Sequence, residues 1–249
     1  MEKAVYFISD IHLGAPSLTR EFETQRRNEL LKFLDEVTIN AKRMVIVGDL
    51  FDFWYEYKSV VPKDFFWLYA RLKAMVEKGI SIDYVAGNHD FFLGDFFSDS
   101  VGLQVHPDGF SEQLAGKKFL IIHGDGLAEK DSGYRMLKRI LKNGFVRSTI
   151  RWIHPDIGFP LAKAFSSKSR EYTSTKDYGE ADGMMLYAES KLRNGYDFVV
   201  MGHNHSPRLE HLAKGVYVNL GDWLHNFTYG LYDGSEMHLL RWEFGHLAK

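Results

Sequence analysis

The feature that most constrains this chain is the stretch of residues 45–52, which reads V-I-V-G-D-L-F-D. Its β-branched run ends at Gly48, a pattern typical of a buried parallel strand that leads into a loop. Asp49 and Asp52 follow at the carboxyl end of that strand, where open α/β sheets place their ligand sites. An Asp-rich turn would explain one such motif as well, but four other strand-like runs also deliver Asp, Asn or His to a loop. The repeated pattern predicts a ligand site at the ends of several strands.

The composition is that of a folded protein with a sizeable core, because 45% of the 249 residues are hydrophobic. No stretch approaches the roughly 18 uncharged apolar residues of a membrane-spanning helix. The chain enters a predicted strand at Ala4 without a cleavable apolar segment, so we expect a cytoplasmic protein. The chain contains no Cys, which excludes disulfides and thiolate ligands. Any bound metal is therefore held by oxygen and imidazole.

Charge is distributed unevenly along the chain, although the net charge is only −2. Residues 126–176 contain eleven Lys and Arg against four Asp and Glu. A basic block of this kind indicates an anionic partner such as phosphate, nucleic acid or a membrane surface, and a solvated helical face is the alternative.

Strand-like and helix-like segments alternate along most of the chain. We predict strands at residues 4–9, 44–47, 80–86, 119–122 and 198–201, and helices at 21–41, 62–78 and 178–193. This alternation predicts a parallel-rich sheet with covering helices. The alternating runs 215–220 and 237–242 predict antiparallel strands of a second sheet. We expect a core formed by residues 1–125 and 178–249, with a basic helical insertion at 126–177.

Five loops carry the polar motifs, which begin at Asp10, Gly48, Gly87, His123 and Gly202 and read D-x-H, G-D-x-x-D, G-N-H-D, H-G-D and G-H-N-H. Several carboxylates in one cleft would repel one another unless cations neutralised them. Oxygen ligands mixed with imidazoles and no sulfur suit Mn, Fe or Zn better than Ca or Mg. Two such metals, about 3.5–4 Å apart and bridged by one Asp, can clamp a phosphoryl group and activate a water for in-line attack.

These five blocks, in this order, resemble the calcineurin-like metallophosphoesterase family, whose pattern runs D-x-H, G-D-x-x-D, G-N-H-[DE], H and G-H-x-H. The resemblance implies an α/β fold, a four-layer αββα sandwich with a helical lid insertion. It also implies two divalent metal ions, with Mn as the first expectation and Fe or Zn as alternatives. The first metal is implied on Asp10, His12, Asp49 and His205, and the second on Asp49, Asn88, His123 and His203.

The same resemblance assigns catalytic roles. Asp49 would bridge the metals, and His89 would face the phosphate and stabilise charge or protonate the leaving oxygen. Asp52 would pair with His89 through its carboxylate and keep the imidazole oriented. Asn88 and His203 are also expected beside the substrate.

Three segments resemble the UDP-2,3-diacylglucosamine diphosphatases of lipid A biosynthesis: residues 48–54, 123–134 and 169–176. That likeness implies hydrolysis of a nucleotide-linked glycolipid to UMP and 2,3-diacylglucosamine 1-phosphate, by a protein peripheral on the cytoplasmic face of the inner membrane. The lid would shelter the two acyl chains. The implied substrate contacts in and near the lid are Asp131, Tyr134, Ser169, Thr173 and Lys176.

The mixture of apolar and cationic residues in the lid suits an amphiphile and an anionic membrane surface, although its aromatic residues could also simply pack on the core. The chain departs from that enzyme group at three positions: His89, Asp52 and Thr173 stand where its best-known members have Arg, Glu and Asn. Another nucleotide diphosphate or phosphodiester therefore stays open as the substrate. A protein that keeps the fold as a binding module, without turnover, is a further alternative. Nucleic acid is not expected, because the basic block lacks the Gly and aromatic platforms of single-strand binders.

Overall fold

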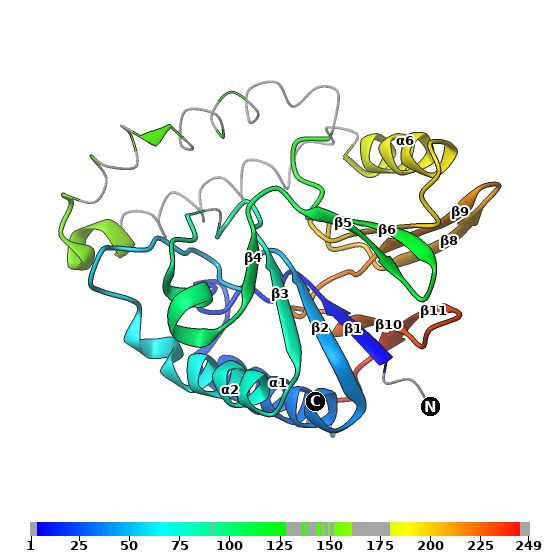
Figure 1. Ribbon diagram of the computed structural model, residues 1–249. Helices are drawn as coiled ribbons and strands as arrows, with labels where there is room; N and C mark the ends of the chain where they lie inside the picture. Colours follow the sequence, from blue (N-terminus) through cyan, green and yellow to red (C-terminus); the bar gives the residue numbers. More distant parts are fainter. Residues whose placement is uncertain are drawn as a thin grey trace.

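The computed structural model describes residues 4–90, 92–127, 152–160 and 180–244, together with positions 136, 138, 143, 144, 146 and 149. Within this part of the chain, two β-sheets face each other and helices cover their outer sides (Figure 1). The predicted αββα sandwich is confirmed. The predicted lid lies largely outside the described residues, and the division of the chain into core and lid stays a prediction.

The first sheet has the strand order β11-β10-β1-β2-β3-β4. Its parallel strands are β1 (Ala4–Ile8), β2 (Ala41–Val47), β3 (Ser81–Val85) and β4 (Gln104–His106). The antiparallel strands β10 (Thr228–Tyr232) and β11 (Met237–Arg241) extend it beyond β1. The parallel half of this sheet directs the ends of β1, β2 and β3 toward the same edge.

Two helices cover the outer face of the first sheet: α1 (Arg20–Asn40) and α2 (Phe66–Glu77). Helix α1 begins where the Thr19 hydroxyl accepts the Phe22 N–H, which satisfies one of the donors that a helix N-terminus leaves open. The short 3-10 helix η1 (Lys63–Phe65) leads into α2, and the π-helix η2 (Phe96–Val101) packs beside it. Buried Leu30, Phe33 and Leu72 seal this layer against the sheet.

The second sheet has the order β5-β6-β7-β9-β8. Its strands are β5 (Phe110–Leu114), β6 (Lys117–Ile121), β7 (Phe198–Met201), β8 (Arg208–Leu212) and β9 (Gly215–Asn219). Strands β6, β7 and β9 run parallel to one another. Helix α6 (Glu180–Arg193) packs on its outer face through Met184, Ala188 and Leu192.

The alternation of side chains along each strand explains why the layers form in this register. In β1, Val5 and Phe7 face the core between the sheets, whereas Tyr6 and Ile8 face the helices. Each fully buried side chain of this kind contributes roughly 1.5–3 kcal/mol, and a slip of one residue would move every one of them to the wrong face. The buried strands therefore fix the positions of the loops that follow them.

The predicted elements agree with the observed ones along most of the chain, but the prediction for the tail was wrong. The run 237–242 forms β11 of the first sheet, whereas the run 215–220 lies in the second sheet as β9, parallel to β7 and antiparallel to β8. The predicted strands 119–122 and 198–201 also belong to the second sheet, as β6 and β7, and not to the sheet of β1, β2 and β3. Alternation identifies a strand with two different faces, but it does not identify the sheet that the strand joins. Among the helices that the structure describes, none combines the length and apolar character that a membrane crossing needs.

Candidate metal centre

The polar loops predicted to form a site do come together at one edge of the sandwich. Asp10 follows β1, Asp49 follows β2 and Asn88 follows β3, while His123 follows β6 and the pair His203 and His205 follows β7. Contacts of 2.9–3.6 Å link these side chains across both sheets. The two sheets thus contribute to one cluster, because their parallel strands end at the same side of the molecule.

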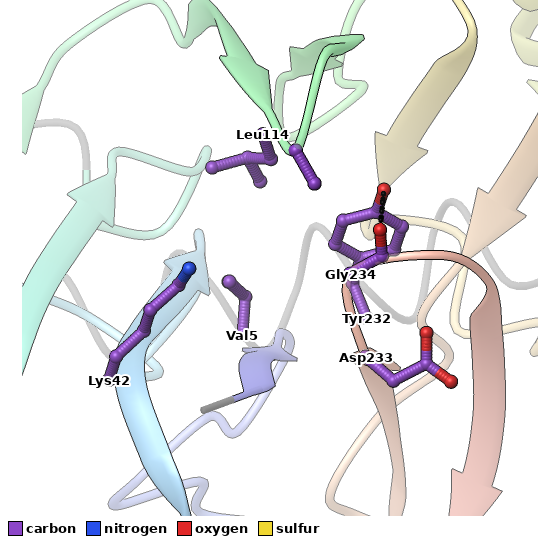
Figure 2. Close-up of a pocket in the computed structure, with 7 residues that line it drawn as sticks. Val5, Lys42, Leu114, Tyr232, Asp233 and Gly234 are labelled. Carbon is purple, nitrogen blue, oxygen red and sulfur yellow. Dashed lines mark hydrogen bonds between the residues drawn. The ribbon is translucent and has the colours of Figure 1, made fainter. Parts of the chain in front are cut away.

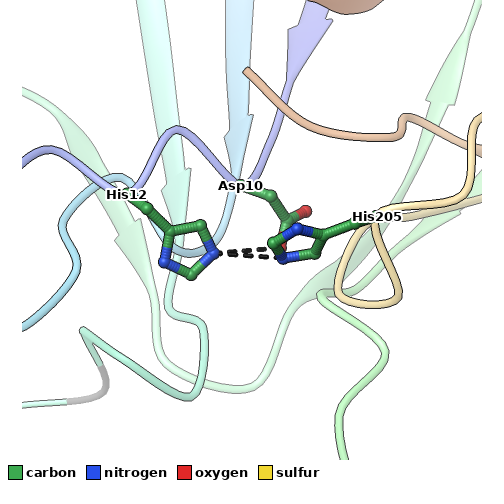
Figure 3. Close-up of side chains that lie close together, drawn as sticks. All are labelled: Asp10, His12 and His205. Carbon is green, nitrogen blue, oxygen red and sulfur yellow. Dashed lines mark hydrogen bonds and ion pairs between the residues drawn. The ribbon is translucent and has the colours of Figure 1, made fainter. Parts of the chain in front are cut away.

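One group of donors comprises Asp10, His12, His205 and Asp49 (Figure 3 shows the first three). The His12 Nε2 atom lies 3.2 Å from His205 Nε2 and 3.6 Å from Asp49 Oδ2. Asp10 Oδ1 lies 3.4 Å from His205 Nε2 and 3.8 Å from His12 Nε2. Donors that each lie about 2.1 Å from one cation are separated by roughly 3.0–3.4 Å. The observed distances between these donor atoms are therefore close to those expected for donors that share one cation.

Asp10 supplies an independent sign that the cluster suits a cation. Its side chain is fully buried, and its Oδ1 atom accepts no hydrogen bond from any described residue. An unsatisfied buried carboxylate oxygen is costly. A divalent cation among these donors would satisfy it.

A second group of donors meets at the Asn88 side chain. Asn88 Oδ1 lies 3.0 Å from His123 Nε2 and 2.9 Å from His203 Nδ1. Asp49 Oδ2 lies 3.4 Å from the same His123 atom. One oxygen of Asp49 is thus near both groups of donors, which is the geometry of a bridging ligand.

Main-chain carbonyls set the proton positions of two imidazoles. His123 Nδ1 donates to the Val47 carbonyl at 2.9 Å, so its Nε2 atom is the one that faces Asn88 and Asp49. His89 Nδ1 donates to the Asp52 carbonyl at 2.7 Å. A carbonyl only accepts hydrogen bonds, so both rings carry a proton on Nδ1.

The structure shows a main-chain contact between Asp52 and His89, and the pairing of His89 with the Asp52 carboxylate stays a prediction. His89 Nδ1 donates its hydrogen bond to the main-chain carbonyl of Asp52, while the Asp52 carboxylate Oδ1 lies 3.7 Å from His12 Nδ1. Both residues are in the cluster, and Asp52 is fully buried. Of the other predicted substrate contacts, Asn88 and His203 belong to the cluster. The remaining five lie outside the described residues: Asp131, Tyr134, Ser169, Thr173 and Lys176.

The backbone of the cluster is strained. In the described residues, seven non-glycine residues have positive φ, and five of them belong to the predicted ligand set: Asp10, His12, Asp49, His203 and His205. Such conformations are uncommon for residues with a Cβ and concentrate at functional sites. This observation is independent of the side-chain distances and marks the same residues.

The glycines of the motifs leave room for the donors. A Cβ on Gly87 would collide with the carboxylate and N–H of Asp49, and one on Gly48 would collide with the His123 ring. A Cβ on Gly202 would collide with the Asp10 carboxylate. These loops are therefore packed too closely for any larger residue at these positions.

The charges of the cluster are strongly coupled. Burial raises the pKa of Asp10, but the nearby imidazoles of His12 and His205 outweigh burial and hold that pKa well below its usual range. Burial lowers the pKa of His12, yet the nearby carboxylates of Asp10 and Asp52 raise it to about 9. Burial and the nearby His123 lower the pKa of His203 to about 4. Without metal, protons on some imidazoles balance the carboxylates, and a metal would take their place.

Two supporting carboxylates were not assigned roles from the sequence. Asp90 accepts N–H groups of Gly87 and Leu50 at 2.7 Å each, that of Asp49 at 3.3 Å, and the Tyr84 hydroxyl. It thereby ties the loop after β3 to the loop after β2. In the sequence, Asp90 is recognisable as the last residue of the motif G-N-H-D. Asp222 accepts the N–H groups of the three successive residues 224–226, and it belongs to none of the five sequence motifs.

A hollow elsewhere in the sandwich has no part in this cluster. It lies between the sheets and is lined by Val5, Lys42, Leu114 and residues 232–234 (Figure 2). Val5 is at the start of β1, whereas Asp10 follows its end. The hollow is therefore near the opposite ends of the parallel strands.

Residues 3–207 match the family model of the calcineurin-like phosphoesterases. The chain belongs to this family and is a hydrolase of the metal-dependent phosphoesterase class. Family membership implies divalent metal ions, and the donor groups described above could hold them.

Similar proteins cover nearly the whole chain. A UDP-2,3-diacylglucosamine hydrolase of Porphyromonas gingivalis is 30% identical over 258 residues, which cover 95% of this chain and 97% of that protein. A protein of the same name from Haemophilus influenzae is 28% identical over 232 residues, covering 91% and 93%. A solved phosphoesterase from E. coli covers 99% of this chain and 97% of its own, with 14% identity and a TM-score of 0.49.

Proposed function

We propose that this protein hydrolyses the pyrophosphate bond of UDP-2,3-diacylglucosamine, giving UMP and 2,3-diacylglucosamine 1-phosphate. The observation that carries the chemistry is the position of Asp49 Oδ2, 3.6 Å from His12 Nε2 and 3.4 Å from His123 Nε2, between two groups of donors. The relatives named UDP-2,3-diacylglucosamine hydrolase support the substrate, because their similarity extends over nine tenths or more of the chain.

We assign the first metal to Asp10, His12, Asp49 and His205, and the second to Asp49, Asn88, His123 and His203. Mn²⁺ is the first choice, with Fe or Zn as alternatives, because the donors are oxygen and imidazole without sulfur. When bound, the two cations supply the Lewis acidity that activates water and neutralises charge on the phosphoryl group.

His89 is the side chain that we assign to the phosphate and the leaving oxygen. Its Nδ1–H donates to the Asp52 carbonyl, so Nε2 is the atom directed to the substrate in this proposal. The His89 N–H also donates to Asp49 Oδ1 at 2.9 Å, which fixes the main chain beside the bridging carboxylate. Asp52 thus acts by orienting His89.

The glycolipid itself would be held by the lid and the loop that precedes it. Asp131, Tyr134, Ser169, Thr173 and Lys176 stay the proposed contacts. Trp152 and Ile157 are 88% and 63% exposed, within a block rich in Lys and Arg. Exposed apolar side chains beside cations suit peripheral contact with an anionic membrane, which we place at the cytoplasmic face of the inner membrane.

A second candidate keeps the chemistry and changes the substrate to another nucleotide diphosphate or phosphodiester. His89 favours it, because the best-known diacylglucosamine enzymes that the chain resembles carry Arg at this position. An imidazole there matches the general pattern of the phosphoesterase family.

Release of UMP by the purified protein with Mn²⁺ tests the proposal. UDP-2,3-diacylglucosamine should be cleaved, and deacylated UDP-glucosamine should lose most of the activity because it cannot use the lid. Equal cleavage of both substrates would favour the second candidate. Absence of UMP from the acylated substrate would refute the first.

A further inference from the structure

Arg26 is a buried cation that lies outside the donor groups. It is on α1 and only 1% exposed. Its guanidinium donates to the main-chain carbonyls of Ile11, His12 and Trp223, the last two at 3.1 Å, and pairs with Glu23 at 2.6 Å. A buried guanidinium is costly unless its donors are bonded. In this protein it is bonded mainly to main-chain oxygens of loops.

The carbonyls that Arg26 holds belong to the two loops around the first donor group. Ile11 and His12 are in the loop that presents Asp10 and His12. Trp223 is in the loop that follows β9, and its N–H donates to the Asp10 carbonyl at 3.1 Å. One side chain therefore joins both loops.

The loop that follows β9 also contacts His205. The Asp222 carboxylate lies 3.7 Å from His205 Nδ1, and Asn226 Nδ2 donates to the His205 carbonyl at 2.9 Å. Asn226 Nδ2 also donates to Asp222 at 2.8 Å. Arg26 therefore contacts the loop whose Asp222 and Asn226 side chains position His205, a donor of the first group.

Glu23 completes the arrangement from the same helix. Its Oε1 atom accepts the Gly14 N–H at 3.1 Å, while Oε2 holds Arg26. Within residues 11–14, one N–H and two carbonyls are thus fixed by side chains of α1. Asp10 and His12 have φ values of 52° and 47°, and such a backbone persists only where its surroundings impose it.

The second donor group has other supports. His123 is fixed by the Val47 carbonyl, and the loop of Asn88 is fixed by Asp90. In the part of the chain that the structure describes, Arg26 and Glu23 make no hydrogen bond to any of these residues. Substitution of Arg26 should therefore weaken metal binding at the first donor group more than at the second.

We infer that Glu23 and Arg26 are a positioning pair that sets the affinity of the first metal site and leaves the second largely unchanged. The inference rests on the metal assignment proposed above. It does not depend on the substrate.

Manganese titration of the metal-free protein tests this inference. Arg26→Met should weaken one of two sites about 10–100-fold, the usual effect of removing a group that orients a ligand. Arg26→Lys should have a smaller effect, because it retains a cation without the planar fork. The control is Arg43→Met. Arg43 pairs with buried Asp83 and with Glu112, and it lies near the start of β2, whereas Asp49 follows the end of that strand.

Double variants identify the site that weakens. In a His203→Ala protein, which retains the first site, Arg26→Met should weaken the remaining Mn²⁺ binding. In a His205→Ala protein, which retains the second site, it should have little effect. The opposite pattern, or equal losses in both proteins, would overturn the inference.

Thermal unfolding separates positioning from general destabilisation. Arg43→Met should lower Tm while both Mn²⁺ affinities stay within about twofold of wild type. A control that loses metal as Arg26→Met does would overturn the inference. If Arg26→Met does not fold, Glu23→Gln carries the same test, because Glu23 is partly exposed and its loss leaves the core intact. A wild-type protein that binds fewer than two metals would overturn the assignment and the inference together, whereas failure to cleave the glycolipid would refute only the substrate.

Discussion

Gly87→Ala is the substitution whose effect follows most directly from the geometry of the site. The added Cβ would lie 2.6 Å from the Asp49 main-chain nitrogen, whereas ordinary contacts begin at 3.4 Å. The loop must therefore move by about 0.8 Å, and the atoms in its way belong to the proposed bridging residue and its main chain. A misplacement of about 1 Å at a reacting centre can cost about 10²-fold in rate. Overpacking of this kind destabilises a protein by about 1–3 kcal/mol.

We expect Gly87→Ala to remain folded, with a lower Tm, and to lose about 10²-fold in kcat/KM on bis(p-nitrophenyl) phosphate, a small substrate that does not need the lid. Metal content should fall in parallel. Gly144→Ala is the matched control, since a Cβ there meets nothing within 4 Å and should leave rate and metal content unchanged. A Gly87→Ala protein with wild-type rate and two bound metals would refute the reasoning about close packing at Asp49.

Other predictions concern the remaining groups of the site. Asp90→Asn should lower Tm and weaken Mn²⁺ binding, because an amide accepts the three N–H groups poorly; unchanged calorimetric titrations would contradict this. His89→Asn should reduce kcat at least about 10²-fold with both metals still bound, and a proportional loss of metal would assign His89 a structural role instead. Burial lowers the pKa of His12, but its carboxylate partners raise it to about 9. Mn²⁺ must displace that proton, so apparent affinity should increase as pH rises from about 6 to 9, and a pH-independent affinity would exclude this coupling. Trp152→Ser should reduce sedimentation with anionic vesicles while hydrolysis of the small substrate stays unchanged, since Trp152 is 88% exposed.

The ends of the buried strands were predictable, and with them most of the donors. Asp10 and Asp49 follow β-branched or aromatic runs whose burial on both faces leaves a single register. Gly48 and Gly87 mark places where a loop must pass close to a neighbour. Residue type and position along the chain are enough for such inferences.

Features that depend on long-range main-chain contacts were not predictable. Asp52 reads as a carboxylate partner for His89, but the hydrogen bond to His89 Nδ1 uses the Asp52 carbonyl, and side-chain chemistry gives no sign of that. No role was predicted for Arg26 from the sequence, because the carbonyls that it binds come together only in the folded loops. The sheet joined by β11 was also undetermined, since alternation describes faces and not neighbours.

The account depends on two cations bridged by Asp49, and anomalous diffraction from crystals grown with Mn²⁺ measures this directly. We predict two anomalous peaks about 3.5–4 Å apart, one among Asp10, His12 and His205, the other among Asn88, His123 and His203, with Asp49 between them. A single peak, or peaks away from Asp49, would contradict the two-metal assignment.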